Sequence, residues 1–80
     1  MKISFKQKMK LKKIVKNNKG KIALRRGPEG HFWFDTNLDL EELDLPQDFK
    51  YVQRLYDDNG GGQYSILDGE ENLGRINVNK

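Results

Sequence analysis

Apolar and polar residues alternate at the start of the chain. Five of the seven odd positions from 3 to 15 are apolar: Ile3, Phe5, Met9, Leu11 and Val15. The even positions are polar apart from Ile14. A period of two is typical of a strand with one buried face. Lys has good helix propensity, but a helix would scatter these apolar residues around its circumference, so the pattern favours a strand over residues 2–16.

Turn signals divide the next segment into two further strands. Residues 17–20 (NNKG) and 27–30 (GPEG) are rich in residues that tolerate a tight reversal. The segments between and after them, 21–26 and 31–35, carry β-type sequences. The sequence therefore predicts a three-stranded antiparallel meander over residues 1–35.

The third predicted strand, HFWFD (31–35), carries aromatic side chains that cannot all face one side. If its two Phe residues point into the core, His31 and Trp33 point away from it. Arg25 and Arg26 lie across the turn, and a Trp beside guanidinium groups is suited to stacking a base or anchoring a protein partner. The alternative is that the C-terminal half of the chain covers Trp33.

The second half of the chain predicts one helix and one hairpin. Residues 39–43 indicate a short helical turn. Pro46 suits the first position of a helix over 46–58, which has apolar residues at helical spacing: Leu45, Phe49, Val52 and Tyr56. Alternation in KYVQRLY indicates a strand as the alternative. Residues 63–68 and 73–79 flank a GEEN turn and predict a C-terminal β-hairpin, with a bulge at Gly74.

These elements predict one domain of 80 residues, α+β and mainly β, with about five strands and one short helix. An SH3-like small barrel is the alternative architecture.

Charge is unevenly distributed along the chain. Residues 2–26 hold eleven of the 15 Lys and Arg residues and no acid, whereas residues 27–80 hold all 12 acids. On a strand, the even-numbered Lys residues would form one row on the solvent face: Lys2, Lys6, Lys8, Lys10, Lys12 and Lys16. Such a row can follow a phosphodiester backbone without reading bases. The alternative is a solvated face whose Lys residues discourage edge pairing.

Residue types for catalysis are scarce. The chain has no Cys, which excludes thiolate chemistry, and no Ser is placed beside its one His, which argues against a Ser-His-Asp triad; no acid pair has a selective spacing. Asp57, Asp58 and Asn59 lack the alternating ligands of a calcium loop. We therefore expect no enzyme activity, cofactor or metal. The longest apolar run, residues 32–34, is too short to span a membrane, and a cytoplasmic location is expected.

The sequence LPQDF (45–49), followed by NGGG (59–62), resembles the signature of SUKH-type immunity proteins, which combines an LPxD-aromatic motif with NGG. The resemblance implies a protein that neutralises another protein by docking on it. We transfer no functional residue from it.

Two functions are consistent with these observations. The first is sequence-nonspecific binding of DNA or RNA, with phosphate contacts from the basic residues and stacking on an aromatic one: Lys6, Lys8, Lys10, Lys12, Lys16, Arg25, Arg26 and Trp33. The second is a protein-binding inhibitor of immunity or anti-defence type that docks on and blocks a partner protein, with a nucleic-acid enzyme as one candidate partner. It would use either the Lys row against an acidic surface or the acidic segment 38–48 against a basic one.

Overall fold

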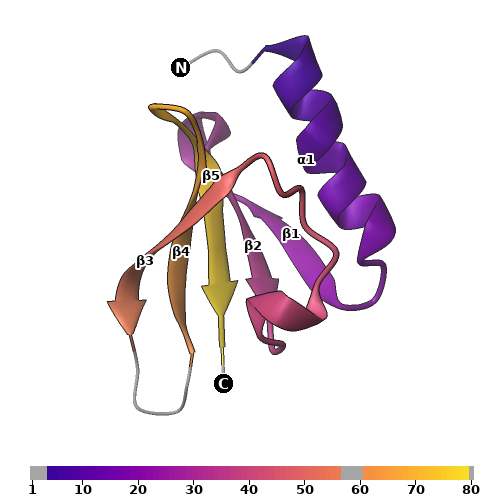
Figure 1. The fold of residues 1–80 in the computed structure, drawn as a ribbon, viewed down its shortest axis with the longest axis vertical. Helices are drawn as coiled ribbons and strands as arrows, with labels where there is room; N and C mark the ends of the chain where they lie inside the picture. The colour runs from indigo at the N-terminus through magenta and orange to yellow at the C-terminus, as the bar shows by residue number, and fades with distance from the viewer. Residues whose placement is uncertain (1–3, 57–60, 80) are drawn as a thin grey trace.

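A helix packs on one face of a five-stranded mixed sheet (Figure 1). The computed structural model describes residues 4–56 and 61–79. Its elements are α1 (Phe5–Asn17), β1 (Ile22–Arg26), β2 (Phe32–Thr36), β3 (Lys50–Tyr56), β4 (Gly62–Asp68), β5 (Glu71–Val78) and two short 3₁₀ helices, η1 (Pro28–Gly30) and η2 (Leu40–Glu42). The expected α+β class with mainly strands is confirmed.

The first element is a helix, so the prediction of a strand over residues 2–16 is wrong. The inward stripe of α1 is formed by Gln7, Leu11, Ile14 and the C-cap Asn18, spaced at i, i+4, i+7 and i+11. Only Leu11 and Ile14 among these four residues are apolar. Gln7 and Asn18 can face inward because their side-chain amides are hydrogen-bonded. Val15, which the strand would have buried, is 36% exposed.

A local signal for this helix is present at its N-terminus. The backbone N–H of Gln7 donates to Ser4 Oγ at 3.2 Å, and the Ser4 N–H donates to Gln7 Oε1 at 3.0 Å. This Ser-x-x-Gln capping box satisfies donors that the first helical turn leaves free. Gln7 also reaches the β4–β5 turn, where its Nε2 donates to Asp68 Oδ2 at 2.8 Å and to Glu71 Oε2 at 3.0 Å.

Only two of the three predicted meander strands exist. β1 and β2 form the expected antiparallel hairpin, with Ile22 opposite Thr36. Because a helix stands where the first strand was predicted, β1 is an edge strand and the sheet order is β1-β2-β5-β4-β3. β2 pairs with β5 in parallel, with Phe34 opposite Ile76. The sheet ends at β1 and β3, so it is open and is not the small barrel considered as an alternative.

The predicted helix over residues 46–58 is also wrong, and the strand alternative is correct. Residues 50–56 form β3, which pairs antiparallel with β4 and has a bulge between Gln53 and Leu55. The helical spacing of apolar residues was fortuitous, because Phe49 is buried whereas Val52 is 41% exposed. Residues 57 and 58 lie outside the described part of the chain.

The C-terminal hairpin is confirmed. β4 and β5 pair antiparallel, and the register shifts between Ile66, which lies opposite Gly74, and Leu67, which lies opposite Asn72. Gly74 has φ +147°, and a Cβ there would lie 2.8 Å from the Phe32 ring, so this bulge needs glycine.

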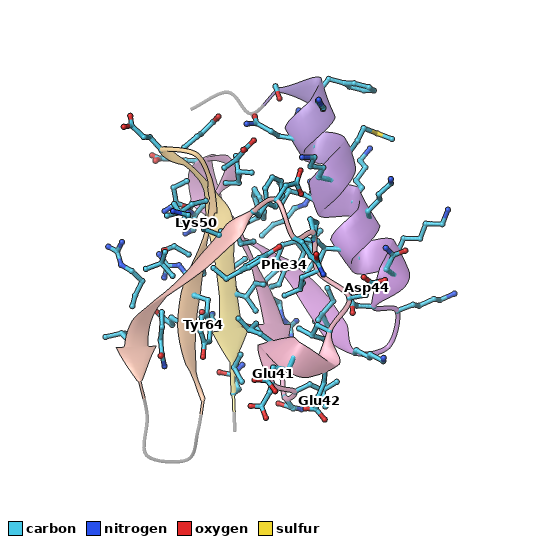
Figure 2. The ribbon with its side chains drawn as sticks, viewed as in Figure 1. Phe34, Glu41, Glu42, Asp44, Lys50 and Tyr64 are labelled. Carbon is cyan, nitrogen blue, oxygen red and sulfur yellow. The ribbon has the colours of Figure 1, made fainter. Side chains whose placement is uncertain are left out.

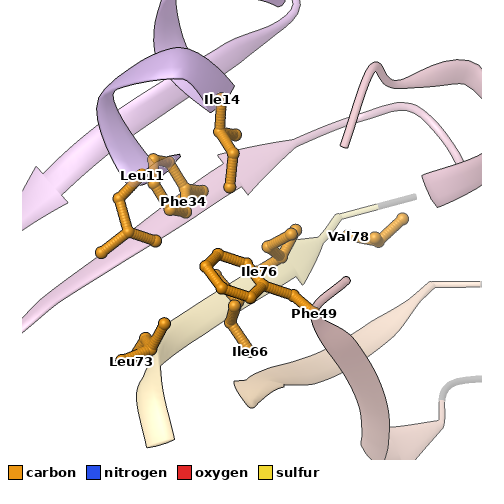
Figure 3. Packing of buried hydrophobic residues seen from close by; sticks show 8 residues of the cluster. All are labelled: Leu11, Ile14, Phe34, Phe49, Ile66, Leu73, Ile76 and Val78. Carbon is orange, nitrogen blue, oxygen red and sulfur yellow. The ribbon is translucent and has the colours of Figure 1, made fainter. Parts of the chain in front are cut away.

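The core lies between α1 and the sheet (Figure 3). It is formed by eight buried apolar residues: Leu11, Ile14, Phe34, Phe49, Ile66, Leu73, Ile76 and Val78. We call the opposite side of the sheet the open face. Side chains that alternate with the core residues point to it: Ala23, Arg25, Trp33, Asp35, Val52, Leu55, Ser65, Arg75 and Asn77.

Ile14 and Val15 test the helix directly, because a strand and a helix bury opposite members of this pair. Ile14 is 1% exposed in the core. We expect Ile14→Ala to lower the free energy of unfolding by about 2–5 kcal/mol, since it leaves a cavity. Val15→Ala is the matched control and should cost less than about 1 kcal/mol. Urea unfolding of both variants measures the difference, and a larger loss for Val15→Ala would contradict the observed helix.

Candidate functional site

The helix divides the predicted single Lys row into two. With 3.6 residues per turn, residues four apart share one side of a helix. The outer Lys row contains Lys8, Lys12 and Lys16. The inner Lys row contains Lys6, Lys10 and Lys13, on the other flank of α1. The single row of even-numbered Lys residues was therefore a wrong prediction, because it assumed strand geometry.

The inner Lys row lies beside acidic residues. The Lys10 ammonium forms an ion pair with the Asp48 carboxylate and lies 5.0 Å from the centre of the Phe49 ring. Lys10 and Lys13 line a cleft of about 250 Å³ together with Asp44 and Asp48. Lys10, predicted to contact phosphate, thus holds the segment before β3 against the helix.

The Lys10 hydrogen bond lowers the pKa of Asp48 below its ordinary value of 3.8, and the charge of Lys6 adds a smaller effect in the same direction. A carboxyl group with a lowered folded-state pKa stabilises the fold above its unfolded pKa, and this contribution is lost as the pH falls through the lowered value. The inner Lys row is therefore already partly neutralised by the protein's own acids.

The outer Lys row has no such partners. Lys8, Lys12 and Lys16 are exposed, and none of them pairs with an acid among residues 4–56 and 61–79. Lys19 and Lys21, which follow α1 in the turn to β1, are exposed as well. The surface from the outer Lys row to the turn is thus cationic and free to meet an anion.

Arg25 and Arg26 point to opposite faces of β1, because they are neighbours on a strand. Arg25 stands opposite Trp33 on the open face, and Arg26 stands opposite Phe32 on the face that carries α1. The eight predicted site residues therefore do not form one surface. The outer Lys row and Arg26 lie on the helix side, whereas Arg25 and Trp33 lie on the other side of the sheet.

The predicted direction of the aromatic side chains in β2 agrees with the structure. Phe34 is buried in the core and Trp33 lies on the open face, where it is half-buried. Trp33 lies against the β1–β2 turn, since a Cβ on Gly27 would be 3.1 Å from Cζ3 of the indole. The His31 ring lies 5.8 Å from the Trp33 ring, centre to centre.

Arg75 is a candidate that sequence reasoning missed. It is exposed on β5, and the parallel register that joins Phe34 to Ile76, continued back by one residue, places it on the open face next to Trp33. The two residues are far apart in the sequence, and no local pattern indicates that β2 and β5 are neighbours.

The acidic segment offers a smaller free surface than the sequence suggested. Glu41 and Glu42 are exposed at the end of η2 (Figure 2). Asp48 is paired with Lys10, and Asp44 lines the cleft beside Lys10 and Lys13. The part of this segment that remains available for a basic partner is therefore centred on η2.

Side chains suited to metal binding are not clustered in the described residues. No cluster of three or more His, Asp or Glu side chains able to hold a metal ion is found there.

Burial raises the pKa of the Tyr51 phenol, whose hydroxyl donates to the Pro46 carbonyl at 3.0 Å. None of the helices described is long and apolar enough to cross a membrane.

Comparison of the chain with protein-family models, curated proteins and solved structures finds no significant match. The interpretation of its function therefore rests on the geometry and charge of the two surfaces.

The pairing of Lys10 with Asp48 can be tested by titration. In the wild type, we expect a pKa of Asp48 below 3.8. In Lys10→Met it should rise towards that value, because the hydrogen bond that favours the carboxylate is lost. Carboxyl ¹³C chemical shifts followed by NMR across the acidic range give both values. Lys8→Met, in the outer row, serves as the control, and an equal rise in that variant would show that Lys10 is not the specific partner.

Proposed function

We propose that the protein is a non-enzymatic, sequence-nonspecific nucleic-acid binder whose outer Lys row contacts the phosphate backbone. The observation that supports this most directly is the outer Lys row itself, which is exposed and unpaired among the described residues while the inner row faces acids. A cytoplasmic location is part of the proposal.

The spacing of the outer row suits a polyanion. Residues four apart on a helix are separated by about 6 Å along its axis, so three ammonium groups span about 12 Å of α1. Each Lys that neutralises a phosphate releases condensed counterions, which makes binding favourable and dependent on salt. Contacts of this kind position a protein on nucleic acid without reading its sequence.

The protein's acids are distributed in a way that spares this surface. Asp44 and Asp48 lie along the inner flank of α1, and Asp68 and Glu71 lie beside Gln7. Residues 4–26 contain no acid at all. A phosphate approaching the outer Lys row therefore meets cations first, and the acids need not repel it.

A double substitution in each row tests the proposal. Lys8→Gln with Lys12→Gln should weaken binding to a short oligonucleotide roughly 10-fold or more at 0.1 M salt. It should also reduce the slope of log affinity against log salt by about 1.4 to 1.8. Fluorescence anisotropy across a salt series measures both quantities.

The matched control is Lys6→Gln with Lys13→Gln, which removes the same charge from the same helix at the inner row. We expect a clearly smaller change in the salt slope for this variant. Equal slopes for the two double variants would refute the assignment of the contact to the outer row, and no binding by the wild type at low salt would refute nucleic-acid binding itself.

A second candidate function, docking on a partner protein as an inhibitor, is supported by a different observation. Phe5 and Met9 lie one turn apart on the outer side of α1 and are 79% and 44% exposed. Phosphate binding does not require exposed apolar side chains. A protein partner with an apolar pocket rimmed by acids would bury both of them beside the outer Lys row, and a nucleic-acid enzyme is one such class of partner.

Phe5→Gln with Met9→Gln separates the two functions. If the protein binds nucleic acid alone, this variant should keep its oligonucleotide affinity within about 2-fold, because it retains every cation. If it acts by docking on a protein, capture of that partner by immobilised wild type should be lost with the variant. A pull-down combined with the anisotropy measurement distinguishes these results.

A further inference from the structure

One row of residues crosses the open face of the sheet from edge to edge. Arg25 stands opposite Trp33 in the β1–β2 pair. The parallel register that joins Phe34 to Ile76, continued back by one residue, brings Trp33 beside Arg75. Arg75 in turn stands opposite Ser65. Trp33 therefore has an Arg residue beside it on each neighbouring strand.

The indole ring of this row is held in place and is still accessible. Gly27 lies against one side of the ring, because a Cβ there would be only 3.1 Å from it. His31 adds a second ring at 5.8 Å, at an angle of 46°. The Trp33 side chain is only half-buried, and its N–H makes no hydrogen bond with a described residue. Such an ordered aromatic ring loses little entropy when it stacks with a ligand.

The two arginines are placed to meet phosphates on either side of that ring. Neighbouring strands are about 4.8 Å apart, so the backbones that carry Arg25 and Arg75 are separated by about 10 Å. Arg25 Nε donates to Asp35 Oδ2 at 3.3 Å, which leaves its two terminal nitrogens free to donate. Asp35 also accepts from Asn77 Nδ2 at 3.2 Å, so its charge is engaged within the face.

We propose that the open face is a base-stacking site for single-stranded nucleic acid, with Trp33 stacking one base and Arg25 and Arg75 binding the adjacent phosphates. Aromatic rings on a sheet, flanked by cations, bind unpaired bases in this way without strict sequence preference. The inference rests on the proposed nucleic-acid binding and names the form of nucleic acid that is bound.

Edge strand β1 explains why the ligand is single-stranded. The outer Lys row lies on the helix side of the sheet, and Trp33 lies on the opposite side. A strand that contacts both surfaces must turn around β1 within a few nucleotides. A flexible single strand can do so, whereas a duplex with a persistence length of about 150 base pairs stays straight over this distance. A duplex also hides its base faces from Trp33.

Trp33 is the sole Trp in the chain, so intrinsic fluorescence reports on this site alone. The experiment titrates the full chain with a 12-nucleotide oligo(dT) and with a 12-base-pair duplex at low salt, recording Trp emission and, in parallel, anisotropy of labelled DNA. We expect the single strand to quench the emission in step with binding. Duplex that binds through the outer Lys row should leave the emission nearly unchanged.

Two variants and one control variant extend the test. Arg75→Gln should weaken single-strand binding several-fold and leave duplex affinity within about 2-fold of the wild type. Arg54→Gln, at the bulge of β3, is the matched control, and it should change neither affinity. Trp33→Leu should lower single-strand affinity roughly 5- to 100-fold. Because Trp33 packs on Gly27, the thermal unfolding of Trp33→Leu is compared with that of the wild type. The quenching measured in the wild type and the affinity of Arg75→Gln test the proposal even if Trp33→Leu does not fold.

The outcomes separate this inference from the function on which it rests. The stacking site is overturned if anisotropy shows single-strand binding, the Trp emission is not quenched, and Arg75→Gln has the same single-strand affinity as Arg54→Gln. That result leaves the contact by the outer Lys row in place. Equal quenching by single strand and duplex overturns the preference for single strands. A wild-type protein that binds neither DNA at low salt overturns the proposed function and this inference together.

Discussion

The buried carboxamide of Asn18 is the interaction on which the arrangement of this protein most depends. Its side chain has 0% exposure. Nδ2 donates to the Ile14 carbonyl at 2.7 Å and to the Asp44 carbonyl at 2.8 Å, and Oδ1 accepts from the Asp44 N–H at 2.7 Å. One residue thus ends α1 and fixes the segment before β3 against it. Without this amide, several backbone groups would be left unpaired, at about 1–3 kcal/mol for each one that is buried.

This connection also sets the electrostatics of the helix. It holds the acidic segment beside one flank of α1, where Lys10 pairs with Asp48. The other flank then carries the outer Lys row, which forms no ion pair with the described acids. A modest net charge of +3 therefore conceals one surface that is internally neutralised and one that is cationic. Surface charge arranged in this way controls association with partners more than it stabilises the fold.

The sheet has a similar asymmetry between its two faces. One face is covered by α1 and holds the core, as antiparallel sheets with a single packed face commonly do. The open face combines Trp33 with flanking arginines, and the exposed apolar residues Val52 and Leu55 lie further along it. Edge strand β1, rich in Arg, joins the cationic helix side to this face. The proposed phosphate contacts use the helix side of this domain, and the proposed stacking site uses the open face.

The sequence alone determined the features that depend on neighbouring residues: the turns at 17–20, 27–30 and 69–72, the hairpins beside the last two, and the outward direction of Trp33 next to Arg25. The tertiary structure decided the rest, because the deciding partners are remote in the chain. Gln7 of α1 faces inward because its side-chain amide donates to Asp68 and Glu71, which are 61 and 64 residues away in the chain. Asn18 faces inward because its side chain is hydrogen-bonded to the backbone of Asp44, 26 residues away. The division of the Lys residues into two rows follows from that helix, and the position of Arg75 beside Trp33 follows from a parallel strand pair that no local pattern specifies.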